Sequence, residues 1–465
     1  MRVLIVGAGI AGLAAARGLR AAGHEVTVLE RAPALRDGGC AIILWSNGTA
    51  ILRDAGVPLD GLGQRLDALD LRSARGRPVM TVDTGRLARR FGAPVVMVPR
   101  RSLIARLAEG LPPDVVRFGA RVTRLRDDGR SVRAETEDGT AYEGDLLVGA
   151  DGIGSVVRTA LQGTALHGTA LHSTALHSTA PGSGSAALAA RPTGAATWQG
   201  LVQDPFGLGS RSLMFLGPQG LVGLHPAGDG LLQWLIDLRW RPGADTPDPA
   251  RALSVLRARY ARWGEPVPAL LATLTGKDLQ LFPHHRHRAP LRWGRGRCVL
   301  IGDAAHAMPP ILALGAGQAL EDVAALTRVL AGTTGRDVAA ALPAYGAGRR
   351  RRAALASAAA TRAVATAGPR RAAGRAALRG AAACPAAPRP GCSAASSAGS
   401  ATTSPADRPA RPGPPRPPPR FAPPRLAPPR PAPAPRPAFA RPAPARSGPQ
   451  ESSRPWRPGR PMLRA

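Results

Sequence analysis

The sequence predicts an α/β protein with an inserted antiparallel sheet and a disordered C-terminal tail. The first 30 residues contain an apolar strand, a glycine-rich turn, an Ala- and Leu-rich helix and a second strand, in that order. Between residues 197 and 238 several short strand-like segments follow one another. From about residue 370 the chain is mainly Pro, Arg, Ala and Ser, a composition that cannot bury a core.

The glycine-rich turn follows a short β-branched strand at residues 2–6. It places Gly7, Gly9 and Gly12 in the G-x-G-x-x-G register, and the second strand ends on Glu30, 18 residues after the last of these glycines. Gly7 permits a tight turn, Gly9 lets the backbone approach a pyrophosphate, and Gly12 lets the helix pack closely on the strand. The helix N-terminus faces the phosphates, and Glu30 can accept hydrogen bonds from a ribose. The segment therefore predicts a Rossmann-like dinucleotide-binding domain rather than a ligand-free glycine turn or a secretory signal peptide.

Two further apolar strands are each followed by an aspartate. One ends on Asp151 and Gly152, and a helix is expected to begin near Ser155. The other, at residues 298–302, is followed by Asp303, two alanines and a histidine. Such small residues indicate a close approach of the backbone to a bulky group, with Asp303 as an acceptor at its rim, although a helix N-cap would give the same pattern.

The other elements are predicted from strand patterns and turn residues. Short β segments fill residues 115–143, with a hairpin turn at Asp138 and Gly139. The strands between residues 197 and 238 have the spacing of an antiparallel sheet outside the nucleotide domain.

Two helices are predicted in the second half of the chain. Asp248 and Pro249 have the residue types of an N-cap and a first helical position, and this helix should run to about Trp263. A longer helix with apolar residues near helical spacing is expected over residues 316–331.

Two segments differ from the rest in composition. Residues 164–180 repeat a pentamer with three histidines, but a five-residue spacing places successive side chains about 140° apart on a helix, which is unsuitable for a metal site. A replication-slippage expansion in a surface loop is the preferred explanation. The proline-rich runs of the tail could dock in an SH3-like groove or on RNA, and an altered reading frame would also explain their composition.

The formal net charge of +31 is concentrated near the C-terminus. From Arg349 onward 23 arginines face only Asp407 and Glu451, so the preceding part is mildly basic. We therefore expect neither nucleic acid nor a membrane as a partner, and there is no run of 18 or more apolar residues. The four cysteines form no C-x-x-C pair and no metal spacing, which predicts a cytoplasmic protein without a metal.

A cluster of histidines at His284, His285 and His287 could bind a metal. The arginines between and after them favour a solvated basic strand edge instead.

Taken together, the glycine turn with Glu30, the segment GADGIGSVVR and the segment GDAAHAMPPILALGAGQALED resemble the FAD-dependent aromatic hydroxylase family. These single-component flavoprotein monooxygenases are typified by para-hydroxybenzoate hydroxylase, and the resemblance covers about residues 1–365. It implies non-covalent FAD, NADPH or NADH as electron donor, and O₂, with a flavin hydroperoxide that hydroxylates or epoxidises an aromatic or polyketide-like small molecule. A flavin-dependent reductase or dehydrogenase, or a catalytically silent FAD-binding protein, remains an alternative.

The resemblance also implies site residues. Glu30 belongs to the ADP-binding half, Asp303 holds the ribityl chain, and the helix after Pro310 directs its N-terminus at the pyrimidine edge of the flavin. The residues assigned to the cofactor are Gly7, Gly9, Gly12, Glu30, Arg31, Arg100, Asp151, Gly152, Asp303, Pro310, Gly315 and Ala316. Trp45 and Asn47 correspond to a segment near the substrate, although structural packing would explain them as well. No catalytic acid or base can be identified, because the chemistry depends mainly on the flavin.

The sequence departs from the family pattern at Ala313 and Leu314, where Gly-Gln is common. If position 313 needs a positive φ, Ala at this position costs about 1 kcal/mol or more.

The resemblance divides the chain into parts of two domains, with an insertion and a tail. We expect the segments to be 1–70 (FAD-binding domain, first part), 71–99 (substrate domain), 100–160 (FAD-binding domain, second part), 161–190 (low-complexity repeat insertion), 191–285 (substrate domain), 286–365 (FAD-binding domain, third part) and 366–465 (disordered tail). The sequence leaves the oligomeric state open.

Overall fold

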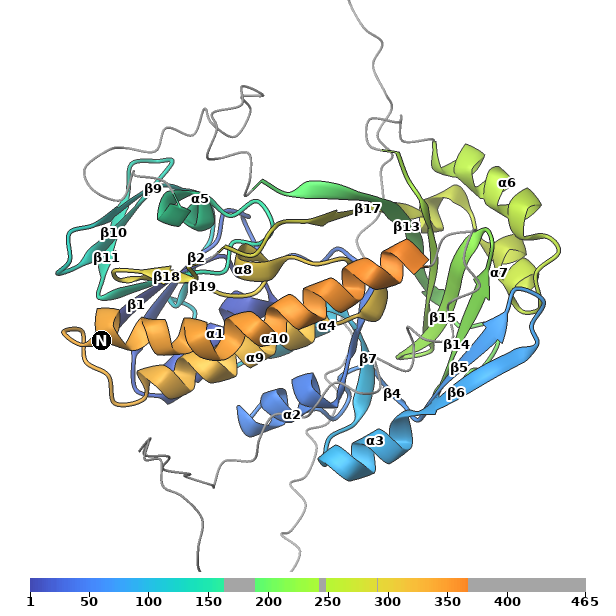
Figure 1. The fold of residues 1–465 in the computed structure, drawn as a ribbon, viewed down its shortest axis with the longest axis horizontal. Helices are drawn as coiled ribbons and strands as arrows, with labels where there is room; N and C mark the ends of the chain where they lie inside the picture. The colour runs from blue at the N-terminus through green and yellow to red at the C-terminus, as the bar shows by residue number, and fades with distance from the viewer. Residues whose placement is uncertain (163–188, 242–247, 291, 367–465) are drawn as a thin grey trace, which may run out of the picture. The chain divides into compact units, whose positions relative to one another are not determined.

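The computed structural model describes residues 1–162, 189–241, 248–290 and 292–366 (Figure 1). The predictions for the pentamer repeat and for the Pro/Arg-rich tail lie outside these residues. Within them, Cys40 and Cys298 are free thiols. No helix of the described residues combines the length and the apolar run that crossing a bilayer requires.

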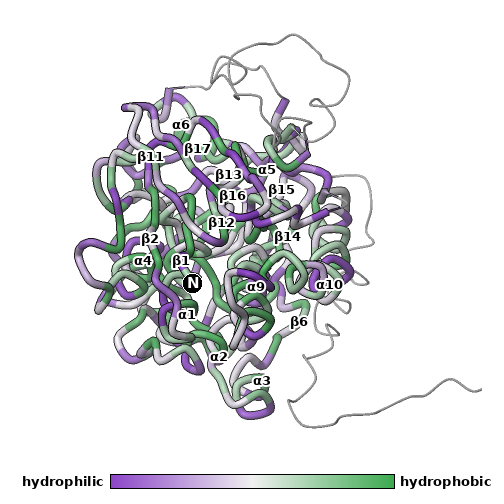
Figure 2. Tube along the Cα trace, turned by 90° about the vertical axis from the view of Figure 1, so that its left-hand side faces the viewer, coloured by the Kyte–Doolittle hydropathy of each residue, from purple (hydrophilic) through white to green (hydrophobic). Residues whose placement is uncertain are grey.

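The first sheet has six strands in the order β18-β19-β12-β1-β2-β8. Its members are β1 (Arg2–Val6), β2 (Glu25–Leu29), β8 (Val116–Arg117), β12 (Leu146–Gly149), β18 (Gly294–Arg295) and β19 (Cys298–Leu300). Neighbouring strands are parallel except for β18 and β19. Residues 3–6 of β1 are all buried, as expected for a central parallel strand that is covered on both faces, and the hydrophobic stretch of the trace is visible at β1 in Figure 2.

Helices cover this sheet and share one core with it. They are α1 (Ile10–Ala21), α2 (Ser46–Asp54), α4 (Arg100–Ala108), α5 (Val156–Gln162), α8 (Asp303–His306), α9 (Gly315–Leu330) and α10 (Val338–Thr366), with the 3₁₀ turn η4 (Pro310–Leu312) before α9. α9 lies between α1 and α10 in the packing and contacts both (Figure 1). The helix predicted over residues 316–331 is confirmed as α9, displaced by one residue.

The structure also contains two three-stranded sheets. One contains β9 (Val122–Asp127), β10 (Val132–Thr136) and β11 (Ala141–Gly144), and the predicted turn at Asp138 and Gly139 joins the last two strands. The other has the order β3-β7-β4 and consists of β3 (Ala41–Leu44), β4 (Gln64–Leu66) and β7 (Val95–Pro99).

The inserted antiparallel sheet has seven strands in the order β17-β13-β16-β15-β14-β5-β6. They are β5 (Ala68–Ser73), β6 (Pro78–Asp83), β13 (Arg191–Gln203), β14 (Arg211–Gly217), β15 (Gly220–Gly228), β16 (Leu231–Arg239) and β17 (Gln280–Arg286). Only the β14–β5 pair is parallel within this sheet. α3 (Thr84–Phe91) follows β6, and a 3₁₀ turn, η3 (Gly276–Asp278), precedes β17. The sheet confirms the predicted fold class.

Two helices, α6 (Pro249–Tyr260) and α7 (Val267–Thr273), pack on one face of this sheet around Trp198, Trp234 and Ile236 (Figure 1). The predicted cap is present, because a carboxylate oxygen of Asp248 accepts the Arg251 N–H at 3.1 Å and Pro249 is the first helical residue. α6 ends at Tyr260, earlier than predicted.

Candidate cofactor and active site

The turn between β1 and α1 has the geometry that its glycines predict. Gly7 has a φ of +102°, and a Cβ at Gly12 would lie 1.8 Å from the Gly7 carbonyl oxygen, so the helix reaches the strand only because no side chain is there. Beside Gly9 the situation is the opposite. Apart from its own chain neighbours and helix, no atom of the described residues lies within 4 Å of a Cβ position there. The helix N-terminus therefore has room for a ligand.

Glu30 lies against this turn at the end of β2 and is 7% exposed. Its carboxylate accepts the Ala8 N–H at 2.7 Å and the Ala32 N–H at 2.9 Å. Each carboxylate oxygen keeps a further acceptor site, so the group can also bind a hydroxyl. The neighbouring Arg31 is exposed and forms no hydrogen bond within the described part of the chain.

Asp151 follows β12 and lies beside Gly7, since a Cβ on that glycine would be 3.0 Å from the Asp151 Cα. Its Oδ2 accepts the Val156 N–H at 2.7 Å at the start of α5. Its Oδ1 is buried and has no partner among the described residues. Burial raises the pKa of Asp151, although the hydrogen bonds oppose this effect. Gly152 next to it has a φ of +78° and open space at its Cβ position.

Arg158 and His287 connect this segment to the loop after β19. The buried Arg158 guanidinium donates to the Ala304 carbonyl at 3.1 Å and to the Ile153 carbonyl at 2.6 Å. The His287 Nε2 lies 2.8 Å from the Asp303 carbonyl oxygen. Burial, together with the charge of Arg158, lowers the pKa of His287, so the ring is neutral at pH 7.

The prediction of a solvated histidine edge on β17 is wrong for two of the three histidines. His284 is 1% exposed because it packs against Thr197 of the neighbouring strand β13, and His287, just after β17, is 5% exposed because it contacts the Asp303 loop. The His284 Nε2 lies 2.6 Å from the Thr197 hydroxyl oxygen. Among the described residues no group of three or more His, Cys, Asp or Glu side chains could hold a metal ion.

The loop after β19 brings small residues against two helices. Gly302 has a φ of +57°, and a Cβ there would lie 3.0 Å from the Ala11 Cβ of α1 and 3.4 Å from the Ala319 Cβ of α9. Asp303 follows at the first position of α8 and is exposed. No described residue donates a hydrogen bond to its carboxylate, which is therefore available as an acceptor at this edge of the sheet.

The turn before α9 holds a strained residue at the position where the sequence departs from the family pattern. Ala313 has a φ of +50°, and its N–H bonds to the Pro310 carbonyl at 2.7 Å. A left-handed conformation costs a non-glycine residue about 1–2 kcal/mol. α9 then begins at Gly315 and Ala316 without a side-chain cap, so its first N–H groups and its positive end remain open to a ligand.

Arg100 is the first residue of α4, and its N–H donates to the Cys40 carbonyl at 3.1 Å. Its side chain runs past Gly39, where a Cβ would lie 3.3 Å from the Arg100 Cδ. The Nε atom is buried without a partner among the described residues. The structure thus brings Gly7, Glu30, Asp151 and Asp303 together, whereas neither Arg31 nor Arg100 bonds to this group.

A buried ionic network behind the Asp303 loop is not predictable from local patterns. Asp322 is fully buried and accepts the Gly302 N–H at 2.8 Å, the His306 Nε2 at 2.5 Å and the Arg349 Nε at 2.8 Å. Arg349 also donates to Glu321 at 2.6 Å. Burial disfavours the charged form of His306, but the adjacent Asp322 carboxylate outweighs it and raises the pKa of His306 overall. The network fixes α10 and the Gly302 turn on α9.

Trp45 lies between the loop at η4 and the inserted sheet, whereas Asn47 lies against α9. The Trp45 Nε1 donates to the Leu312 carbonyl at 3.2 Å, and the Asn47 Nδ2 donates to Glu321 at 2.7 Å. Trp45 also packs in a small apolar cluster, which we call the junction cluster. It consists of Ala41, Ile43, Trp45, Leu66, Val95, Met97, Leu201, Ala227 and Leu231.

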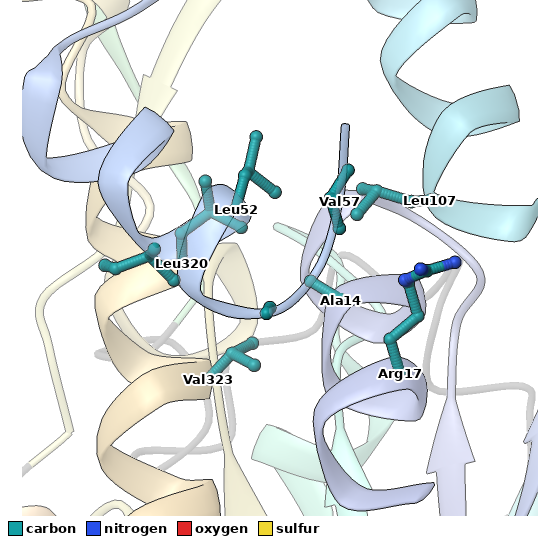
Figure 3. Close-up of a pocket in the computed structure, with 9 residues that line it drawn as sticks. Ala14, Arg17, Leu52, Val57, Leu107, Leu320 and Val323 are labelled. Carbon is teal, nitrogen blue, oxygen red and sulfur yellow. The ribbon is translucent and has the colours of Figure 1, made fainter. Parts of the chain in front are cut away.

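A small apolar pocket lies elsewhere, among α1, α2, α4 and α9 (Figure 3). Ala14 and Arg17 line it from α1, and Leu320 and Val323 line it from α9. None of the twelve predicted cofactor residues lines this pocket, so it is separate from the candidate site.

Comparisons with known proteins agree with this geometry. The model of the FAD binding domain family matches residues 1–360. Aurachin C monooxygenase/isomerase from Stigmatella aurantiaca is 32% identical over 358 residues, which cover 76% of this chain and 86% of the relative. FAD-dependent urate hydroxylase from Klebsiella pneumoniae is 30% identical over 355 residues, covering 75% and 86%. The structure of Klebsiella pneumoniae HpxO complexed with FAD and uric acid has a TM-score of 0.70 and 27% identity, covering 82% and 91% of the two chains.

Proposed function

Because the chain belongs to the FAD binding domain family, and FAD-dependent monooxygenases and hydroxylases are its relatives, we propose that it uses NADPH or NADH and O₂ to hydroxylate or epoxidise an aromatic or polyketide-like small molecule. The chain is an FAD-binding oxidoreductase. We propose the electron donor, the oxygen chemistry, the substrate class and the roles of the individual residues.

The described residues fit FAD. Glu30, Asp151 and Asp303 present carboxylate oxygens after β2, β12 and β19 of one parallel sheet, and one of these oxygens is buried without a partner among the described residues. The open space at Gly9 and at Gly315 lies at two helix N-termini, where backbone N–H groups favour anionic groups. This convergence of acceptors with two open helix ends is the observation that carries the proposal.

The proposed role of each residue follows from its chemistry. The N-terminus of α1 would hold the pyrophosphate, and Glu30 and Asp303 would accept hydrogen bonds from ribose and ribityl hydroxyls. When bound, FAD would supply two-electron reduction and the reaction with O₂. The positive end of α9 would stabilise negative charge on the reduced ring, a term of about 0.3–2 kcal/mol. Trp45 and the η4 turn would exclude water from the substrate side. The division into FAD-binding and substrate domains is part of the same proposal.

The test uses the full-length purified protein. Its absorbance spectrum should show bound flavin, NADPH or NADH should bleach that spectrum without oxygen, and admission of air should restore it with consumption of O₂. Without a substrate, slow NAD(P)H oxidation with release of hydrogen peroxide is expected. A flavin that is reduced but indifferent to oxygen would favour a dehydrogenase. A bound flavin that neither dinucleotide reduces, with any aromatic ligand added, would favour a silent FAD-binding protein.

A further inference from the structure

The face of the inserted sheet that α6 and α7 do not cover carries polar side chains in the middle of its strands. Along β16, Leu232, Trp234 and Ile236 pack against these helices, so the residues that alternate with them project to the other face. Gln233 is one of these residues. It pairs with Leu201 of β13 and with His225 of β15, which places the three side chains in one row.

This row lies beside the candidate cofactor site. Leu201 belongs to the junction cluster, in which Trp45 also packs, and Trp45 donates to the Leu312 carbonyl in the turn before α9. β15 packs on β4 and β7 of the small sheet at the same junction. The polar row therefore lies next to Trp45 and the η4 turn.

The polar atoms of the row are buried but incompletely paired. Gln233 is 3% exposed, and its Nε2 donates to the Gln199 Oε1 at 3.4 Å, while its own Oε1 has no partner among the described residues. His225 is 2% exposed and its Nδ1 also has no partner there. Proteins pair nearly all buried polar groups, so unpaired atoms on a face next to a cofactor site point to a ligand.

The arginines of the neighbouring strands either lie far along the strand from the row or, like Arg211, lie on the face that α6 and α7 cover, where Arg211 bonds to Asp70. The arginines of the strands that flank it stand at strand ends: Arg191, Arg211, Arg239 and Arg286. Arg239 is six residues from Gln233, which corresponds to about 20 Å along the strand. Burial lowers the pKa of His225 to about 4, so this ring is neutral at pH 7. Asp237, further along the same face of β16, would repel an anion.

We propose that Gln233, Gln199 and His225 are specificity-determining residues, and that the substrate is an uncharged ring with hydrogen-bonding groups on its edge rather than an aromatic carboxylate. The inference rests on the proposed function, because it assumes that the substrate of the flavin chemistry lies on this face. The Gln233 carbonyl accepts a hydrogen bond from the ligand, and the row offers no cation to neutralise a carboxylate.

The test compares two probes that differ in one group. Salicylamide carries a neutral carboxamide where salicylate carries a carboxylate. Titration of each into the full-length FAD-loaded protein is followed by the perturbation of the flavin spectrum. We expect salicylamide to bind about tenfold more tightly than salicylate, or better. The Gln233→Leu variant should lose about tenfold in affinity for salicylamide, whereas Gln219→Leu, the same change in the turn between β14 and β15, should bind it like the wild type.

The Gln199→Arg variant introduces a cation at the row, at a half-buried position. It should gain about tenfold or more in affinity for salicylate, because it adds the missing cation. Tighter binding of salicylate by the wild type, no binding of either probe, or no gain by Gln199→Arg would overturn the inference. A yellow protein that NADPH or NADH reduces would leave the proposed function standing in each of these cases, whereas a colourless protein would contradict that function itself.

Discussion

The edge of the parallel sheet and the face of the inserted sheet that α6 and α7 do not cover hold their polar groups in different ways. At the edge, carboxylates stand just after strands, and neighbouring backbone N–H groups orient them, as Ala8 and Ala32 orient Glu30. On the inserted sheet, polar side chains stand within strands, and their partners come from adjacent strands, as Gln199 does for Gln233. The first arrangement depends on local turns and the second on strand register. The variants below perturb one arrangement or the other.

The largest effect is expected from the buried network that supports the edge. Asp322→Asn removes a charge that faces His306 and Arg349, and breaking such a buried ion pair costs about 3–5 kcal/mol. Denaturant titration should show this loss of unfolding free energy. Asp337→Asn, which changes an exposed carboxylate that accepts a bond from Thr334, should remain within about 1 kcal/mol of the wild type. Equal stability of the two variants would show that the network does not hold the edge.

Two glycines of the turn have different roles, because Gly12 lets the helix pack on the strand and Gly9 leaves space for a ligand. Gly12→Ala forces a Cβ to within 1.8 Å of the Gly7 carbonyl oxygen and should cost about 3 kcal/mol or more. Gly9→Ala meets no described atom within 4 Å beyond its chain neighbours and helix, so the apoprotein should keep its stability while flavin content falls. Thermal unfolding of apoprotein and the flavin-to-protein absorbance ratio measure the two effects. A Gly9→Ala protein with full flavin content would contradict the placement of the pyrophosphate.

A buried carboxylate of the inserted sheet, Asp237, should add a pH dependence to the stability of the protein. Burial raises the pKa of Asp237 to about 6, so the folded protein keeps a proton that the unfolded chain releases from about pH 4 upward. The contribution of Asp237 to stability should therefore fall as pH rises from about 4 to 6, by up to about 3 kcal/mol, whereas the contribution of His225, whose pKa is lowered, has the opposite sign. Asp237→Asn should remove this contribution. Parallel stability curves of variant and wild type between these pH values would refute the assignment.

The smallest effect concerns the strained turn before α9. Ala313→Gly relieves a φ of +50° and should stabilise the protein by up to about 1 kcal/mol. The matched substitution Ala324→Gly, inside α9, should destabilise it by about 1 kcal/mol. Chemical denaturation of both variants gives the comparison, and a loss of stability in both would show that Ala313 carries no strain.

Local patterns predicted the parts of the molecule that depend on local geometry. The three glycines and Glu30 follow from turn chemistry, because a turn constrains only its own residues. The positive φ at Ala313 was considered only because the resembling family commonly has a glycine there. The strand that ends before Asp303 was predicted for the same reason. The position of this carboxylate beside Asp151 follows from parallel pairing of β12 and β19, which brings their carboxyl ends to one edge.

The parts that depend on register were missed. His306 and Arg349 bond to Asp322 across 16 and 27 residues of sequence. The apolar pattern of a helix does not indicate which other helix it packs against, so these contacts could not be predicted. The burial of His284 and His287 was missed because their charged neighbours suggested a solvated edge, whereas the packing of β17 decides their exposure. One signal for the polar row was present. In LLQWLIDL, Gln233 and Asp237 are polar at an even spacing within an apolar strand, which places them on one face.

The most direct test of the account is the flavin content of Asp303→Ala beside that of the wild type. Asp303 is an exposed carboxylate without a hydrogen-bond donor in the described structure, and loss of its bonds to a ligand should cost about 1.5–3 kcal/mol of binding free energy. We expect a yellow wild type, an equally yellow Asp114→Ala control at another exposed carboxylate, and an Asp303→Ala protein that loses its flavin on gel filtration. Equal flavin content in all three proteins would contradict the assignment of this edge as the FAD site.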